Sequence, residues 1–188
     1  SKNILITGAG GSIGTELCNQ ILNLLPNKII CLESSEFALY QIQEVLNKIL
    51  IKKSLNLDIS YMLGSIQDDL FLQSIFKTTK IDTIFHTAAY KHVPIIEDNI
   101  IEGIKNNIIG TKNLCDLSLR YQVKNFILIS SDKAVRPTNY MGITKRVSEL
   151  ICQAKSQTKN ITNFSIVRFG NVIGCLLYTS DAADERNS

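Results

Sequence analysis

A run of hydroxyl, carboxyl and amine side chains, Ser131-Asp132-Lys133, is the part of this sequence best suited to proton transfer. It follows an apolar stretch that reads as a buried strand, so these side chains fall where a strand ends. Met141 and Lys145 are four residues apart, which places them one turn apart on one face of a helix. Core packing of Met141 and a solvated Lys145 are the simpler interpretations. Both weaken because Ser131-Asp132-Lys133 lies just upstream.

A glycine-rich turn near the start of the chain has the spacing of a nucleotide-binding loop. Gly8, Gly11 and Gly14 follow an apolar run and open a helix. Glycines at this spacing permit a tight turn, a close approach of the backbone to a diphosphate, and close packing of helix on strand. The helix N-terminus offers free N–H groups and a positive dipole end to the anion. An ordinary strand-to-helix turn is the alternative, but the context predicts a dinucleotide site at Gly8, Gly10, Gly11, Ser12, Ile13 and Gly14.

An acidic residue, Glu33, ends the second apolar run, about 20 residues beyond the glycine turn. Its carboxylate can accept hydrogen bonds from the adenosine ribose and would repel a 2′-phosphate. No arginine or lysine follows nearby to compensate, so we expect NAD rather than NADP. The alternative is a solvated glutamate at a helix start, beside Ser34 and Ser35.

The fourth apolar run ends in His86, followed by the small residues Ala88 and Ala89. Small side chains there would let a cofactor lie against the backbone. We interpret His86 as a histidine satisfied within the core and assign it no proton transfer. Lys91 and His92 follow in a loop, where they either contact a substrate or are simply solvated.

Six short apolar runs, each bounded by turn residues, alternate with stretches of helical period such as Leu39, Ile42, Val45 and Leu46. The runs predict buried parallel strands at residues 3–7, 28–33, 58–63, 82–87, 124–130 and 163–169. Such alternation predicts an α/β fold with a doubly wound parallel sheet. Right-handed crossovers would then bring all carboxyl ends of the strands to one edge, where a ligand would bind.

Composition excludes several classes of function. The 188 residues carry a net charge of only +3 without a basic block, which argues against nucleic acid or a membrane surface as a partner. No apolar run reaches the length of a membrane span, and we expect no signal peptide. Five dispersed cysteines without a CxxC pair predict reduced core thiols, no metal site and a cytoplasmic location.

The last stretch of the sequence fits neither strand nor helix periodicity. Residues 175–185 match the translation of a transposon-based sequencing adapter, and a disordered natural tail is the alternative. We therefore expect a nucleotide-binding domain at residues 1–174 and a non-native tail at residues 175–188, with the substrate domain missing. A chain of this kind is expected to bind the cofactor but to lack turnover.

The motifs together resemble the CapD-like polysaccharide-biosynthesis dehydratases of the extended short-chain dehydrogenase/reductase superfamily. The resemblance is carried by residues 6–21, 86–99, 104–113, 129–146 and 167–174. Met141 stands where the tyrosine of the YxxxK pair would be, Ser131 where threonine is usual, and Ser65 where many relatives have aspartate. The resemblance places Ser34, Ser65, Ile66, Ala88, Ala89, Tyr90, Asn107 and Lys145 at the cofactor, and Lys91, His92 and Asn171 at the substrate.

The resemblance implies a 4,6-dehydratase acting on UDP-N-acetylglucosamine, with NAD(P) regenerated in each turnover. Lys133 resembles the base for C5, and burial or a neighbouring cation would favour its neutral form. Asp132 resembles the acid for the C6 hydroxyl, and Ser131 would contact the C4 oxygen. A thioether cannot accept the C4 hydroxyl proton, so Asp132 or a water held by Lys145 must do so. Methionine in the tyrosine position resembles the branch that retains configuration at C5.

Two other functions compete with this interpretation. A nucleotide-sugar 4-epimerase would need only reversible oxidation at C4, and the Asp132-Lys133 pair argues against it. A sensor that holds NAD without turnover is favoured by the missing tyrosine and opposed by Lys133 and Lys145. The family also implies a homo-oligomer at full length, and long relatives carry a membrane region ahead of this segment.

Overall fold

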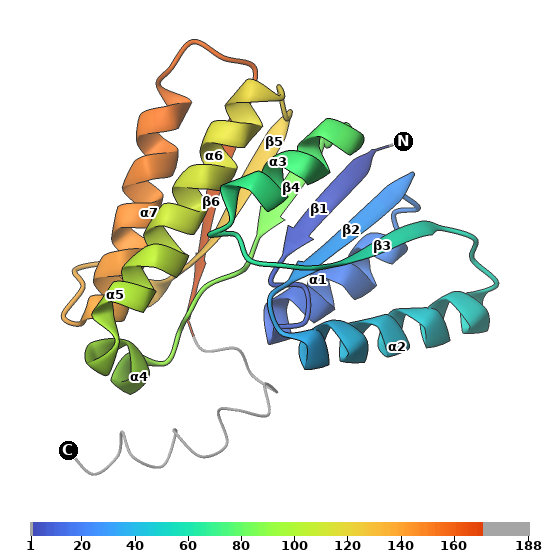
Figure 1. Cartoon of the computed structure of the whole chain (residues 1–188), viewed down its shortest axis with the longest axis horizontal. Coiled ribbons are helices and arrows are strands. Elements are labelled where there is room, and N and C mark those ends of the chain that lie inside the picture. The colour runs from blue at the N-terminus through green and yellow to red at the C-terminus, as the bar shows by residue number, and fades with distance from the viewer. Residues whose placement is uncertain (1, 171–188) are drawn as a thin grey trace.

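Six parallel strands form one sheet in the order β3-β2-β1-β4-β5-β6 (Figure 1). The computed structural model describes residues 2–170, and Asn171 and the expected tail at residues 175–188 lie outside the described residues. The strands are β1 (Asn3–Thr7), β2 (Lys28–Glu33), β3 (Asp58–Leu63), β4 (Thr83–His86), β5 (Asn125–Ser131) and β6 (Asn163–Phe169). This order, with chain reversal between β1 and β4, is that of a doubly wound nucleotide-binding sheet, and the predicted fold class is confirmed.

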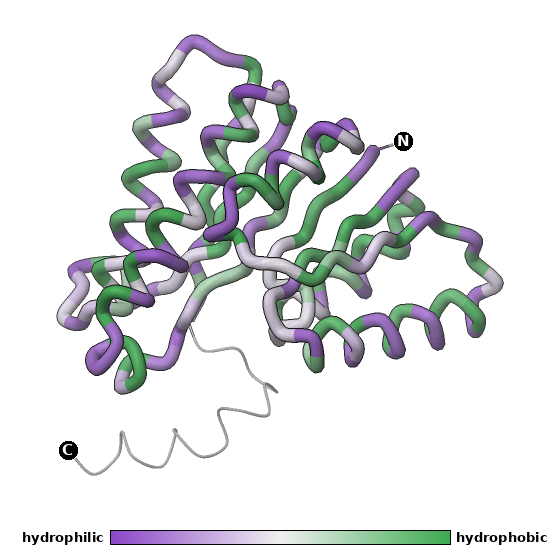
Figure 2. The backbone as a smooth tube through the Cα atoms, viewed as in Figure 1, coloured by the Kyte–Doolittle hydropathy of each residue, from purple (hydrophilic) through white to green (hydrophobic). Residues whose placement is uncertain are grey.

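Helices cover both faces of the sheet. They are α1 (Ser12–Leu22), α2 (Glu36–Lys53), α3 (Asp69–Thr78), α4 (Val93–Asp98), α5 (Ile100–Gly103), the π-helix η1 (Ile104–Ile109), α6 (Gly110–Arg120), the 3₁₀ turn η2 (Asp132–Ala134) and α7 (Tyr140–Ser156). Figure 1 shows α1 and α2 on one face and α3, α6 and α7 on the other. Figure 2 shows mainly hydrophobic strands, whereas the helices alternate hydrophobic and hydrophilic positions.

Two hydrophobic clusters fill the spaces between the sheet and its helices. Alternate residues of a strand point to opposite faces, so Leu5 packs with α3 and α6 while Ile4 and Ile6 pack with α1 and α2. The helical spacing of Leu39 and Ile42 places both in the second cluster. Val45, which was grouped with them by its helical spacing, is instead 38% exposed to solvent.

Polar side chains cap the N-termini of α2 and α7, the helices that follow the carboxyl ends of β2 and β5. Ser35 accepts a hydrogen bond from the Ala38 N–H at the start of α2. Asn139 Oδ1 accepts one from the Gly142 N–H at the start of α7, at 2.7 Å. Each contact satisfies an N–H group that the helix itself leaves unpaired.

The cysteines of the described residues are buried free thiols, as the sequence predicted. Cys18 and Cys31 lie 3.8 Å apart, and Cys115 and Cys152 lie 3.7 Å apart, between sulfur atoms. Side-chain hydrogen bonding and burial raise the pKa of Cys31 and of Cys115, which keeps these thiols protonated. Within residues 2–170, no helix is long and apolar enough to cross a membrane.

Candidate functional site

The glycine turn between β1 and α1 leaves no room for side chains at Gly8 and Gly14, nor at Gly10, where a Cβ would lie 2.7 Å from the Ala38 carbonyl oxygen. Gly8 has a φ of 68° and lies against Ala88, since a Cβ on Gly8 would be 2.7 Å from the Ala88 Cα. A Cβ on Gly14 would collide with the carbonyl oxygen of Gly8. Only glycine fits these positions, and the turn therefore brings α1 directly onto the end of β1.

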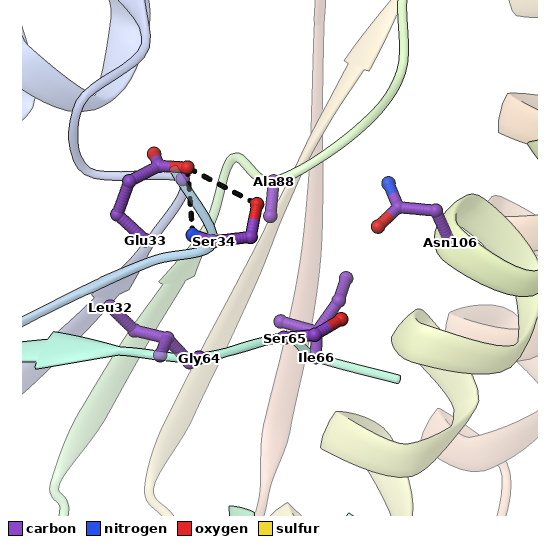
Figure 3. A pocket seen from close by; sticks show the side chains of 9 residues that line it. Leu32, Glu33, Ser34, Gly64, Ser65, Ile66, Ala88 and Asn106 are labelled. Atoms are coloured by element: carbon purple, nitrogen blue, oxygen red, sulfur yellow. Dashed lines mark hydrogen bonds between the residues drawn. The ribbon is translucent and has the colours of Figure 1, made fainter. Parts of the chain in front are cut away.

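The Glu33 carboxylate links the glycine turn to the start of α2. Its Oε2 accepts a hydrogen bond from the Gly10 N–H at 3.1 Å. Its Oε1 accepts from the N–H groups of Ser34 at 2.8 Å and Ser35 at 3.1 Å. Figure 3 shows this carboxylate beside Ser34 at the pocket. The residue predicted to select the cofactor thus also holds the shape of the turn.

A pocket opens at the carboxyl ends of β1, β2 and β3, where the topology predicts a ligand (Figure 3). Apolar surfaces meet polar groups within it, which suits a flat ring joined to a hydroxylated sugar. It is lined by Gly8, Leu32, Glu33, Ser34, Gly64, Ser65, Ile66, Ala88 and Asn106. Leu32, Gly64 and Asn106 were not predicted from the sequence. Leu32 and Gly64 are next to residues that were predicted. The sequence gives no reason to choose Asn106 over the adjacent Asn107, which was predicted in its place.

The Asn107 side chain hydrogen-bonds the backbone of Tyr90, in the segment that follows β4. Its Oδ1 accepts from the Tyr90 N–H at 2.8 Å, and its Nδ2 donates to the Tyr90 carbonyl at 3.0 Å. Nδ2 also donates to Thr144 Oγ1 on α7 at 2.9 Å. The side chain is therefore occupied in holding the segment after β4 against α7. The π-helix η1 carries both asparagines, so Asn106 faces the pocket while Asn107 faces the core.

His86 is fixed between two threonine hydroxyls in the core. Thr111 Oγ1 donates to the Asn107 carbonyl at 2.5 Å, so it accepts from His86 Nε2 at 2.9 Å. The remaining ring nitrogen, Nδ1, then accepts from Thr7 Oγ1 at 2.7 Å. Burial and then the charge of Lys145 lower the pKa of His86 to about 3. A neutral, satisfied histidine is what the sequence predicted.

The Ser131-Asp132-Lys133 segment forms a tight turn at the end of β5. Asp132 Oδ1 accepts from Ser131 Oγ at 2.9 Å and from the Lys133 N–H at 2.8 Å. The other oxygen, Oδ2, faces the end of β6, since a Cβ on Gly170 would lie 3.2 Å from it. Gly142 lets α7 pack on this turn, because a Cβ there would collide with the Lys133 carbonyl. The structure thus brings β5, β6 and α7 together at these side chains.

Met141 and Lys145 share one face of α7, as their spacing predicted, and the structure buries that face. Met141 is 3% exposed and Lys145 is 9% exposed, whereas Tyr140 is 44% exposed. Lys145 Nζ donates to the Ile129 carbonyl of β5 at 2.7 Å. Burial lowers the pKa of Lys145 from 10.5 to about 8, against the opposing effect of the Glu149 charge. An amine with this pKa can be either proton donor or proton acceptor near neutral pH.

The remaining predicted residues lie around the same edge. Lys91 and His92 are exposed at the start of α4, and Ala89 is half-buried beside them. Ser12 and Ile13 begin α1. Among residues 2–170, no cluster of three or more acidic, cysteine or histidine side chains could hold a metal ion.

The sequence of this chain is similar to those of known polysaccharide-biosynthesis proteins. The family described as "Polysaccharide biosynthesis protein" matches residues 4–176. Capsular polysaccharide biosynthesis protein CapD of Staphylococcus aureus is 40% identical over 93% of this chain and 28% of its own length. UDP-N-acetylglucosamine 4,6-dehydratase (inverting) of Campylobacter jejuni is 36% identical over 92% of this chain and 50% of its own length. The chain therefore spans half or less of these relatives.

Solved structures share the fold. Pen from Bacillus thuringiensis has a TM-score of 0.81 and 31% identity, over 99% of this chain and 56% of that protein. DesIV, a dTDP-glucose 4,6-dehydratase of Streptomyces venezuelae solved with NAD, has a TM-score of 0.76 at 21% identity, over 88% and 55%. With a family match across almost the whole described chain, the protein belongs to the polysaccharide biosynthesis protein family.

Proposed function

We propose that this chain is the cofactor-binding and catalytic part of a nucleotide-sugar 4,6-dehydratase for surface polysaccharide or glycan biosynthesis. The observation that carries the proposal is the placement of Asp132 and Lys133 at the end of β5, against the helix that carries Lys145. An acid and a base at C5 and C6 are needed for dehydration and not for 4-epimerisation. The named function of the Campylobacter relative supports UDP-N-acetylglucosamine as the substrate.

The pocket and the glycine turn fit NAD. The close packing of Gly8 and Gly14 leaves backbone N–H groups at the start of α1 for the diphosphate. Glu33 and Ser34 would bind the adenosine ribose, and Ser65, Ile66 and Asn106 would surround the adenine. Bound at this site, NAD would supply the hydride acceptor for oxidation at C4 and the hydride donor for reduction at C6. The neighbour solved with NAD supports this cofactor.

Each catalytic side chain has a distinct task in this proposal. Ser131 hydrogen-bonds the C4 oxygen, Lys133 removes the C5 proton, and Asp132 protonates the departing C6 hydroxyl. Lys145 is the better of the two acceptors for the C4 hydroxyl proton, directly or through water, because its pKa is lowered to about 8. Asp132 Oδ1, by contrast, already accepts two hydrogen bonds.

The stereochemical outcome is part of the proposal. Met141 occupies the position next to Lys145 on the buried helix face and carries no ionisable group. With no tyrosine to act there, we propose retention of configuration at C5. We also propose that Lys91, His92 and Asn171 contact the substrate, and that residues 1–174 form the natural nucleotide-binding domain.

The test is the product formed by the full-length gene product from UDP-N-acetylglucosamine and NAD, identified by NMR. A 4-keto-6-deoxy sugar that retains the C5 configuration supports the proposal. UDP-N-acetylgalactosamine as sole product would identify a 4-epimerase. NAD binding without any sugar product would support the sensor function. A 4-keto-6-deoxy product with inverted C5 would contradict only the assignment made from Met141.

A further inference from the structure

A fully buried carboxylate, Glu149 on α7, accepts four hydrogen bonds. Oε1 accepts from Ser130 Oγ at 2.6 Å and from Arg168 Nε at 2.7 Å. Oε2 accepts from Arg168 Nη2 at 2.6 Å and from Arg146 Nη1 at 2.9 Å. These contacts fill the acceptor positions of a carboxylate. Burial alone would raise the pKa of Glu149, but the hydrogen bonds from Arg168, Ser130 and Arg146 lower it to about 2. The group is an anion at any ordinary pH.

The partners of Glu149 each belong to a segment of the proposed catalytic edge. Ser130 directly precedes the Ser131–Lys133 turn on β5. Arg168 lies two residues before Gly170, which faces Asp132 across the end of β6. Glu149 itself follows Lys145 by one helical turn. The Glu149 carboxylate therefore connects β5, β6 and α7 at the ends that carry the Ser131–Lys133 turn and Lys145.

The charges around Lys145 come from several elements. His86 on β4 is neutral, and the Ile129 carbonyl of β5 accepts from the amine. On α7, Glu149 and Cys152 favour the ammonium form, with Glu149 the larger influence. The turn η2, which carries Asp132 and Lys133, packs against the same helix.

The two arginines bear on Lys145 through Glu149. Arg146 and Arg168 are both within salt-bridge distance of the carboxylate, and their side chains are 38% and 39% exposed. Arg146 adjoins Lys145 in the sequence, so its cation would oppose the ammonium form of Lys145 if the carboxylate that compensates it were removed. Glu149 therefore both compensates the arginines and favours the charged amine.

We propose that Glu149 is a positioning residue. It holds the Ser131–Lys133 turn, α7 and the end of β6 together at the carboxyl edge of the sheet, and it sets the protonation of Lys145. The inference rests on the proposed function only in treating Lys145 as a group that acts on the sugar. A merely structural carboxylate would affect folding and leave the titration of Lys145 in place.

The test is an NMR titration of the chain carrying ¹³C-labelled lysine, with the Lys145 signal assigned by its loss in Lys145→Met. Glu149→Gln keeps the shape of the side chain and removes the charge, and we expect the Lys145 midpoint to fall by about 1 pH unit. Glu149→Asp keeps the charge, and the midpoint should stay closer to that of the unmodified chain. Arg146→Gln is the matched control, because it removes an opposing cation and should raise the midpoint.

A folded Glu149→Gln variant with an unchanged midpoint overturns the proposal. If that variant does not fold, Arg146→Gln decides, and an unchanged midpoint there has the same consequence. The titration needs no substrate, so its outcome is independent of whether the sugar reaction occurs. In the full-length gene product, the pH profile of sugar turnover should move in the same direction as the Lys145 midpoint. A profile that stays fixed while the midpoint moves would overturn the catalytic part of the inference.

Discussion

The replacement Lys145→Met should stabilise the chain at neutral pH while removing an amine of the proposed site. Lys145 is buried, and its pKa of about 8 lies below the ordinary value of 10.5. A lysine is charged below its pKa, so folding disfavours the protonated form. This cost is fully present below pH 8 and disappears as the pH rises from 8 to 10.5. At 1.36 kcal/mol per pH unit it amounts to about 3 kcal/mol at pH 7.

The net effect of Lys145→Met is smaller, because the amine also makes a hydrogen bond. Loss of the contact from Nζ to the Ile129 carbonyl should cost about 1 kcal/mol. The expected gain is therefore about 2 kcal/mol at pH 7, or a rise in Tm of roughly 4–8 °C for a domain of this size. Near pH 10 the remaining cost of the amine falls below about 1 kcal/mol, and the gain should vanish.

Urea unfolding at pH 7 and at pH 10 measures the change in unfolding free energy at each pH. It is followed by circular dichroism, because the chain has no tryptophan for fluorescence. Lys133→Met is the matched control, since Lys133 is only partly buried and its replacement should change stability by less than about 0.5 kcal/mol. A Lys145→Met variant that is less stable at pH 7 would refute the reasoning. So would a gain of equal size at both pH values.

Five further outcomes are expected. Gly14→Ala should lower the unfolding free energy by about 1–3 kcal/mol through collision with the Gly8 carbonyl. A Cβ on Gly11 would lie 3.3 Å from the Gly8 carbonyl oxygen, so Gly11→Ala should lower the unfolding free energy by less than about 1 kcal/mol. Its main effect should be weaker NAD binding, measured by calorimetry. In the full-length gene product, Lys133→Met should lower dehydration by roughly 10²- to 10⁴-fold, and C5 exchange in deuterated solvent should fall with it. NADP should bind at least about tenfold more weakly than NAD because of the Glu33 charge, so tighter or equal binding rejects that role. The pKa of His86 in the folded chain is about 3, so the free energy of unfolding should fall as the pH drops from 6.5 toward 3. This group contributes at most about 1.4 kcal/mol per pH unit to that fall. In urea unfolding, His86→Asn should make the dependence on pH less steep.

The strands were predictable because each reads as a short apolar run, including the edge strands β3 and β6, which are only partly buried. Four of the six strand ranges agree with the structure to the residue. The predicted strand at residues 82–87 is shorter in the structure, and the one at residues 124–130 is displaced by one residue. Asp82 explains the later start of β4, since its carboxylate accepts a hydrogen bond from the Asn3 N–H and its carbonyl accepts from the N–H groups of Lys124 and Asn125. It connects strand ends and does not continue β4.

The polar pairs of the site were not predictable, because their members are far apart in the sequence. Thr7 and His86 are 79 residues apart, and Glu149 and Arg168 are 19 apart. Arg146 and Glu149 are spaced like an ordinary pair on a solvated helix face, yet Glu149 is fully buried. The π-helix η1 also has no periodic signal in the sequence, and it decides which of two adjacent asparagines faces the pocket.

The two buried charges at the proposed catalytic edge, Glu149 and Lys145, differ in how completely neighbouring groups compensate them. Glu149 has all its acceptor positions filled by neighbouring side chains, so it has little capacity left for a ligand. Lys145 has three N–H donors, and the described contacts use one of them, on a neutral carbonyl. A buried charge without full compensation costs stability, and such groups concentrate where a protein binds or transforms a ligand. This difference supports our proposal that Glu149 belongs to the framework and Lys145 to the chemistry, although both lie on the same helix one turn apart.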